Sequence, residues 1–258
     1  MSASTFAIYP SLDGMPVIVS GGASGIGESI VREFAAQGSK VGFVDIAVEP
    51  GRRLEAELRG KGQTVMFTEC NVKDIEAYRS AIAGFAAAHG PALALVNNAA
   101  HDERHDWRNV TPEFWDDRIA VNLKHAFFAA QAVLPDMIAA KKGSIINFGS
   151  ISWMILTGNL AAYTASKAAM HGLSRSLARD VGKHGVRVNT LAPGWIMTER
   201  QLTHWVDEAA GKLIDEQQAL AGRLYPADIA RMVLFLAADD SKMISAQDFI
   251  VDGGWAHG

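Results

Sequence analysis

The sequence predicts an α/β protein built on a doubly wound parallel sheet with helices on both faces. Short apolar runs that suit buried strands alternate with stretches in which apolar residues recur every three or four positions, the helical interval. Such alternation is typical of parallel sheets. Several apolar runs end in Gly, Asp, Asn or Ser, and ligands bind these sheets at the carboxyl ends of the strands. We expect one domain over residues 1–258.

Seven apolar runs are the expected strands. In chain order they are residues 17–20, 41–44, 64–67, 92–96, 144–148, 186–191 and 249–251. The expected helices are a segment that begins near residue 30 and stops near 38, then 75–88, 114–134, 163–181, 199–218 and 227–237. The segment 199–218 is polar, and it fits a lid over a substrate as well as a plain amphipathic helix.

A glycine-rich turn directly after the first strand is a candidate ligand site. Residues 21–27 read Gly-Gly-Ala-Ser-Gly-Ile-Gly and lead into a helix. This arrangement can offer backbone amides and a helix N-terminus to a pyrophosphate, although an ordinary flexible loop also contains such glycines. Asp45 ends the second strand. A carboxylate there can accept both ribose hydroxyls of an adenosine and repels a 2′-phosphate, so we favour this role over that of a turn or cap residue.

Tyr163 and Lys167 form a second candidate site. They are four residues apart, so on a helix both side chains project from one face. A phenol titrates near ~10, and a neighbouring cation lowers that pKa by roughly 1–3 units. Ser150 follows the fifth strand and can fold back toward the pair. The group suggests proton transfer, whereas the pattern taken alone also fits a solvated surface pair.

The polar stretch 101–107 leaves the fourth strand at the same edge and reads His-Asp-Glu-Arg-His-Asp-Trp. Its two histidines do not make the His-Glu-x-x-His zinc motif and no third ligand is evident, so we expect no metal. A solvated loop is one interpretation. The other is a rim that binds a polyol, because carboxylate, guanidinium and imidazole groups can share hydrogen bonds with sugar hydroxyls.

Composition excludes other classes of function. The net charge of −4 comes without a basic cluster, so nucleic acid is not an expected partner. No run reaches the roughly 18 apolar residues of a membrane span. One cysteine, Cys70, allows no intrachain disulfide. Residues 1–14 lack the features of a signal peptide, and we expect a cytoplasmic protein.

Seven motifs in order resemble the classical short-chain dehydrogenase/reductase family. They are residues 20–27, 97–100, 121–122, Ser150, Tyr163 with Lys167, 193–194 and 251–254, and the similarity runs from about residue 12 to 255. The chain departs from the family pattern at three places. Ser20 stands where Thr is common, Ala100 where Gly is common, and Asn71 where an Asp contacts adenine.

The resemblance implies a Rossmann-type fold and NAD-dependent oxidation of an alcohol. Tyr163 would remove the hydroxyl proton, Lys167 would lower the pKa of Tyr163 and hold the nicotinamide ribose, and Ser150 would orient the hydroxyl. Asn122 would support a proton relay, whereas its position in an apolar helix also fits a paired core amide. The implied cofactor-binding residues are Gly21, Ser24, Gly25, Ile26, Gly27, Asp45, Ile46, Asn71, Val72, Asn98, Ala99, Tyr163, Lys167, Pro193, Gly194, Ile196 and Thr198.

Three segments, 102–107, 147–153 and 193–201, resemble the bacterial aldose 1-dehydrogenases of the family. The implied reaction oxidises the C1 hydroxyl of an aldopyranose to a lactone. D-galactose is the first candidate, followed by L-arabinose, L-fucose, D-xylose and L-rhamnose. The expected substrate residues are Asp102, Arg104, His105, Ser150, Ser152, Trp153, Asn159, Tyr163, Trp195 and Arg200.

Two wider alternatives stay open. One is a dehydrogenase of a different secondary alcohol. The other is an NAD-binding sensor or structural subunit, since a fold does not fix a function. The family resemblance also implies a homotetramer, with interfaces on the helices around 114–134 and 163–181 and on the last strand.

Overall fold

The computed structural model describes residues 6–256, so the two ends of the predicted domain, 1–5 and 257–258, lie outside the described residues. One parallel sheet contains β1 (Pro16–Ser20), β2 (Lys40–Asp45), β3 (Val65–Glu69), β4 (Ala94–Asn97), β5 (Gly143–Phe148), β6 (Val186–Pro193) and β7 (Asp248–Val251). Their order is β3-β2-β1-β4-β5-β6-β7. The chain therefore reverses direction across the sheet between β1 and β4, where such folds bind ligands. The predicted fold class is confirmed.

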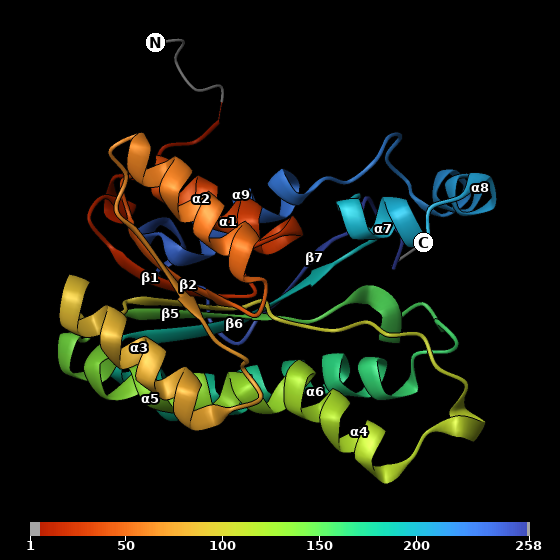
Figure 1. The fold of residues 1–258 in the computed structure, drawn as a ribbon, viewed down its shortest axis with the longest axis horizontal. Coiled ribbons are helices and arrows are strands. Elements are labelled where there is room, and N and C mark those ends of the chain that lie inside the picture. Colours follow the sequence, from red (N-terminus) through yellow and green to blue (C-terminus); the bar gives the residue numbers. More distant parts are fainter. Residues whose placement is uncertain (1–5, 257–258) are drawn as a thin grey trace.

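Helices cover both faces of this sheet (Figure 1). On one face lie α1 (Gly25–Ala36), α2 (Val48–Gly60) and α9 (Pro226–Ala237), and on the other α3 (Ile75–His89), α5 (His125–Ala140) and α6 (Ala161–Val181). The helix α2 was not among the predicted helices. It is rich in charge and buries only Gly51, Leu54 and Leu58, so its apolar stripe is short.

Two apolar layers hold the sheet between the helices. Phe34, Ile30 and Val233 belong to the layer under α1 and α9, and Phe85 and Met137 to the layer under α3 and α5. Full burial of such side chains contributes roughly 1.5–3 kcal/mol each. All eight residues of β6 are buried, including the polar Arg187, Asn189 and Thr190, as expected of a strand covered on both faces of a parallel sheet.

The predicted helix 114–134 is present as one uninterrupted helical stretch, and the structure adds a π-helical turn inside it. The structure has α4 (Pro112–Ile119), a π-helical turn (Ala120–Lys124) and then α5. The π turn contains Asn122, whose side chain is buried and bonds a neighbouring loop. Wider turns of this kind are frequent at functional sites.

The predicted helix 199–218 is two separate helices in the structure, α7 (Glu199–His204) and α8 (Glu208–Gln217). Each begins at its own N-cap. The Thr198 hydroxyl accepts from the amide of Gln201 at 3.3 Å, and the Asp207 carboxylate accepts from the amide of Ala210 at 2.8 Å. These caps start two helices where periodicity alone suggested one. Within residues 6–256, no helix combines the length and the apolar character that crossing a membrane requires.

Candidate active site

The glycine turn is locked to the end of β4 by Ser20, a buried residue that we did not predict as part of the site. Its hydroxyl accepts from the amides of Asn98 and Ala99 at 3.2 and 3.1 Å. The side-chain amide of Asn98 donates in return to the carbonyls of Ser20 and Gly21, both at 3.0 Å. A buried hydroxyl at the end of an apolar strand was the available signal, because such a group must be paired.

The glycine turn forms a cradle that side chains would fill. A Cβ on Gly27 would lie 1.8 Å from the carbonyl oxygen of Gly21, and one on Gly25 would lie 3.3 Å from Cγ2 of Thr198. Ser24 occupies the N-cap of α1 but makes no side-chain cap bond. The first amides of α1 therefore face the turn, as a pyrophosphate requires. Thr198, one of the predicted cofactor-binding residues, therefore lies against the turn.

The carboxylate of Asp45 is fixed at the end of β2. One oxygen accepts from the amide of Ala23 at 3.0 Å and the other from the amide of Ala47 at 2.9 Å. The neighbouring Ile46 side chain is 70% exposed. The amide of Cys70, which follows the adjacent strand β3, donates to the Asp45 carbonyl at 3.0 Å. Asn71 and the buried Val72 therefore follow β3 at the same edge as Asp45, where the adenosine end of a dinucleotide was predicted.

Lys167 anchors α6 to the end of β5. Its side chain is only 2% exposed, its ammonium donates to the carbonyl of Phe148 at 2.8 Å, and its Nζ lies 5.7 Å from the centroid of the Tyr163 ring. Ser150 lies just beyond Phe148, and its hydroxyl accepts from the amide of Ser152 at 3.1 Å. Serine, tyrosine and lysine thus meet at the carboxyl edge of the sheet, as predicted.

The expected lowering of the Tyr163 pKa by Lys167 is not what the structure shows. The pKa of Tyr163 is raised to about 12, first by burial and then by the charge of Asp102, against the opposing effects of a hydrogen bond with Ser150 and the charge of Arg104. Burial also lowers the pKa of Lys167 to about 7. Desolvation disfavours both charged forms, so it outweighs the attraction that the spacing of the two residues suggested.

Asn122 bonds both backbone groups of His101. Its side-chain oxygen accepts from the His101 amide at 2.8 Å, and its side-chain nitrogen donates to the His101 carbonyl at 3.1 Å. These two bonds pair the buried side-chain amide of Asn122, as expected for the alternative role of a core amide. It also fastens the start of the loop 101–107 to the helix that carries Asn122.

The loop 101–107 and the helix α7 share a network of polar and aromatic contacts. Asp102 accepts from the side-chain amide of Gln201 at 2.9 Å and pairs with Arg200 at 3.1 Å. The Trp195 indole donates to Gln201 at 3.0 Å, and the Arg104 guanidinium lies 5.2 Å from the Trp205 ring. Three predicted substrate residues, Asp102, Arg200 and Trp195, are therefore brought together. Gln201, which joins them, was not among the predicted site residues.

Other predicted substrate residues lie elsewhere around this edge. Trp153 is 40% exposed, and its indole donates to Nε2 of the buried His171 at 3.2 Å. Ser152 is buried beside Ser150. Asn159 adopts a left-handed backbone with φ of 57°, and its carbonyl accepts from the amide of His105 at 2.9 Å.

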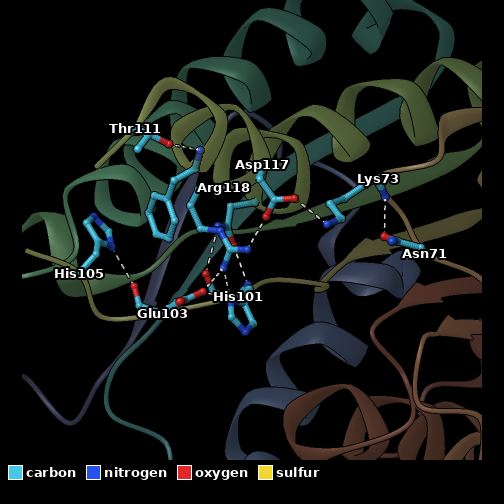
Figure 2. Close-up of polar contacts among 10 residues, drawn as sticks. Asn71, Lys73, His101, Glu103, His105, Thr111, Asp117 and Arg118 are labelled. Atoms are coloured by element: carbon cyan, nitrogen blue, oxygen red, sulfur yellow. Dashed lines mark hydrogen bonds and ion pairs between the residues drawn. The ribbon is translucent and has the colours of Figure 1, made fainter. Parts of the chain in front are cut away.

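A cluster of side chains around Arg118 contacts the loop 101–107 and was not predicted from the sequence. Figure 2 shows the Arg118 guanidinium among His101, Glu103 and Asp117. Its bond to Glu103 is 2.9 Å long, and Asp117 also pairs with Lys73 at 2.6 Å. Burial and the charge of Arg118 lower the pKa of His101, which favours its neutral ring. The available signal was the charged stretch that contains Glu113, Asp116, Asp117 and Arg118.

Metal ligands do not gather in the described part of the chain. Across residues 6–256 there is no group of three or more His, Cys, Asp or Glu side chains that could hold a metal ion. In the loop 101–107 the histidines are instead engaged by protein groups, His101 by Arg118 and His105 by two backbone groups.

Comparisons with known proteins agree with this geometry. The family model described as Enoyl-(Acyl carrier protein) reductase matches residues 21–256. A D-xylose 1-dehydrogenase of Caulobacter vibrioides is 41% identical over 249 residues, covering 96% of this chain and 98% of that protein. A probable galactose dehydrogenase of Rhizobium meliloti is 41% identical over 247 residues, covering 95% and 96% of the two chains.

A solved structure shares the architecture. A blue fluorescent protein from a metagenomic library, crystallised in complex with NADPH, is 32% identical with a TM-score of 0.87, covering 95% of this chain and 99% of that one. Fold, edge geometry and sequence similarity over most of the chain lead to one conclusion. This chain belongs to the short-chain dehydrogenase/reductase family of oxidoreductases.

Proposed function

We propose that this protein is an NAD-dependent aldose 1-dehydrogenase, which oxidises the C1 hydroxyl of an aldopyranose to a lactone, with D-galactose the first candidate. The observation that carries the proposal is the polar network of Asp102, Arg200, Gln201 and Trp195 beside Tyr163. The charge of Asp102 raises the pKa of the Tyr163 phenol. Hydrogen-bonding groups at this place suit a sugar better than an apolar substrate. The relatives named for xylose and galactose support the same class.

Each catalytic residue has a role in this reaction. The phenolate form of Tyr163 takes the proton of the C1 hydroxyl and becomes the phenol, and Ser150 orients that hydroxyl by a hydrogen bond. Lys167, anchored on Phe148, holds the ribose next to the nicotinamide, and Asn122 supports the relay of the proton. The bound dinucleotide supplies the acceptor for the hydride that leaves C1. As the proton and the hydride depart, the C1–O bond becomes the lactone carbonyl.

We infer NAD rather than NADP from Asp45. Its carboxylate is held by two backbone amides at the ribose position and carries a negative charge that repels a 2′-phosphate. A solved relative was crystallised in complex with NADPH, so membership of the family does not by itself select NAD. The proposal therefore rests on the residue at this strand end.

Turnover of a substrate panel tests the proposal. The formation of reduced cofactor is measured with D-galactose, L-arabinose, D-fucose, L-fucose, D-xylose, L-rhamnose, D-glucose, a secondary alcohol and a hydroxysteroid, each with NAD and with NADP. We expect one aldose to stand out with NAD, because a site that bonds particular hydroxyls rejects epimers that leave its groups unpaired. Turnover of only the alcohol or the steroid would refute the aldose assignment, and equal efficiency with NADP would refute the role of Asp45. If a pentose or a deoxy sugar is turned over more efficiently than D-galactose, only the choice of D-galactose is wrong and the aldose assignment stands.

A pair of variants locates the sugar site. Asp102→Ala removes the acceptor shared by Arg200 and Gln201, and we expect it to raise KM for the sugar much more than KM for NAD. Asp106→Ala is the matched control, since Asp106 lies in the same loop and its side chain pairs with Arg108 just beyond the loop. Equal effects of the two substitutions on sugar KM would argue that the loop is a solvated rim.

A further inference from the structure

The helix that carries Tyr163 lacks a cap from its own chain neighbours. Leu160 occupies the N-cap of α6 and makes no side-chain cap bond. A helix leaves its first four amides without intrahelical acceptors, and an apolar N-cap residue cannot supply one. Tyr163 stands in this first turn, so the order of the turn decides where the phenol lies.

His105, from the loop 101–107, supplies the missing acceptor. Its Nε2 accepts from the amide of Ala162 at 3.3 Å, and its Nδ1 lies 2.9 Å from the carbonyl of Glu103. A carbonyl can only accept, so Nδ1 carries the proton and Nε2 is the acceptor. Both ring nitrogens are thus engaged by backbone groups. A sugar hydroxyl could bond this ring only by displacing one of them.

The His105 ring is held in place from three sides. Its backbone amide donates to the carbonyl of Asn159, just before α6, at 2.9 Å. Its ring meets the edge of Phe114 with the centroids 5.0 Å apart. Figure 2 shows the His105 ring directed toward Glu103. Because these contacts already order the ring, its bond to the Ala162 amide requires little further loss of side-chain freedom.

The other end of the same loop is tied to Asn122 through His101. The loop therefore spans the two helical segments that carry Asn122 and Tyr163, while Asp102 and Arg104 lie between its fixed ends. Ordering of the loop and placement of the Tyr163 phenol become parts of one arrangement.

We propose that His105 is a positioning residue for the hydride-transfer reaction, capping the catalytic helix α6 one residue before Tyr163, rather than a ligand of the sugar. The inference rests on the proposed role of Tyr163 as the base. It assigns to the neutral imidazole a function that the loop's polar composition alone did not suggest.

Two substitutions separate capping from sugar binding. His105→Leu removes the acceptor, and we expect kcat to fall roughly tenfold, the effect of losing about one cap bond on a transition state, with KM for the sugar and Kd for NAD nearly unchanged. His105→Gln keeps an acceptor near the position of Nε2, and we expect it to restore most of kcat. Hydrogen exchange of the peptide containing residues 161–164 should quicken in His105→Leu and stay near wild type in His105→Gln.

Controls make the outcomes decisive. His184→Leu removes a histidine that follows the opposite end of α6 and should leave kcat unchanged. A selective rise in sugar KM for His105→Leu, with kcat intact, would overturn the proposal in favour of a sugar ligand. Wild-type kcat and exchange in His105→Leu would overturn it outright. Tyr163→Phe is measured alongside: if that variant keeps its turnover, the proposed chemistry fails, whereas an inactive Tyr163→Phe beside a fully active His105→Leu sinks only the positioning role.

Discussion

Burial shifts the pKa values of Tyr163 and Lys167 in opposite directions, and each shift favours the uncharged form of the group. The phenol is harder to ionise than a free tyrosine, with a pKa of about 12, and the ammonium is easier to neutralise, with a pKa of about 7. The lysine therefore serves this site first as an anchor, through its bond to Phe148, and only secondly as a charge. The remaining electrostatic control comes from Asp102 and Arg104, which shift the phenol in opposite directions.

The phenol of Tyr163 provides the prediction at this scale. We expect Tyr163→Phe to lower kcat by ~10²–10⁴, the usual contribution of a general base, while NAD binding persists. Because the pKa of Tyr163 is raised, its phenolate in the cofactor-free protein should form only above the usual phenol value of ~10. Ultraviolet difference titration of wild type against Tyr163→Phe measures this directly. If the difference titration shows the Tyr163 phenol ionising near neutral pH, burial does not dominate its pKa.

The elements proposed to bind the dinucleotide are held together by close backbone approach. The turn between β1 and α1 packs against the end of β4 through Ser20 and Asn98, and Gly27 leaves no room for a side chain there. This contact sets the distance between the first helix and the sheet. The glycine at this position is a packing requirement as well as a matter of ligand approach.

A pair of glycine substitutions tests that requirement. Gly27→Ala would place a Cβ 1.8 Å from the Gly21 carbonyl oxygen and 2.7 Å from the Asn98 side-chain nitrogen. We expect it to lower the free energy of unfolding by roughly 1–3 kcal/mol, as overpacking does, and to weaken NAD binding. Gly84→Ala in α3 meets no atom within 4 Å and should instead stabilise the protein by roughly 0.5–1 kcal/mol. Urea unfolding and dinucleotide titration of both variants check this, and unchanged NAD binding in Gly27→Ala would count against the cradle.

For the whole molecule we propose a homotetramer, as the family resemblance implies. Large apolar side chains remain exposed on the helices predicted to form interfaces, with Trp115 on α4 at 40% and Phe127 on α5 at 41%. The strand β7 ends the sheet order, so one of its edges lacks a neighbouring strand within the described sheet. Exposed aromatic surface and a sheet edge are both features that a partner subunit can cover.

Light scattering at micromolar concentration should give the mass of four chains for the wild type. We expect Phe127→Glu to reduce that mass, because it places a charge within the proposed apolar interface. Ile8→Glu, on an exposed apolar residue outside these helices, is the control and should leave the mass unchanged. A monomeric wild type would refute the assembly, while the fold and the active-site assignment would stand.

Local spacing along the chain was enough to predict the strands, one helix face and the functional edge of the sheet. Apolar runs and helical intervals located the seven strands, and the four-residue spacing placed Tyr163 and Lys167 on one helix face. Positions at strand ends predicted that the glycine turn, Asp45 and Ser150 share one edge, because parallel strands end on the same side. Periodicity was less reliable at helix ends, where capping by Thr198 and Asp207 divided one predicted helix into two.

The hydrogen-bond partners of the site residues could not be predicted from the sequence and became known from the packed structure. The bond from Gln201 to Asp102, the acceptor that His105 offers to Ala162 and the pairing of Asn122 with His101 all join segments whose spacing in the chain carries no signal. The direction of the Tyr163 pKa shift also depends on tertiary packing, since desolvation is set by everything packed around a group. Spacing along the chain defines neighbours within an element, whereas contact between elements and exclusion of water arise only when the elements pack together.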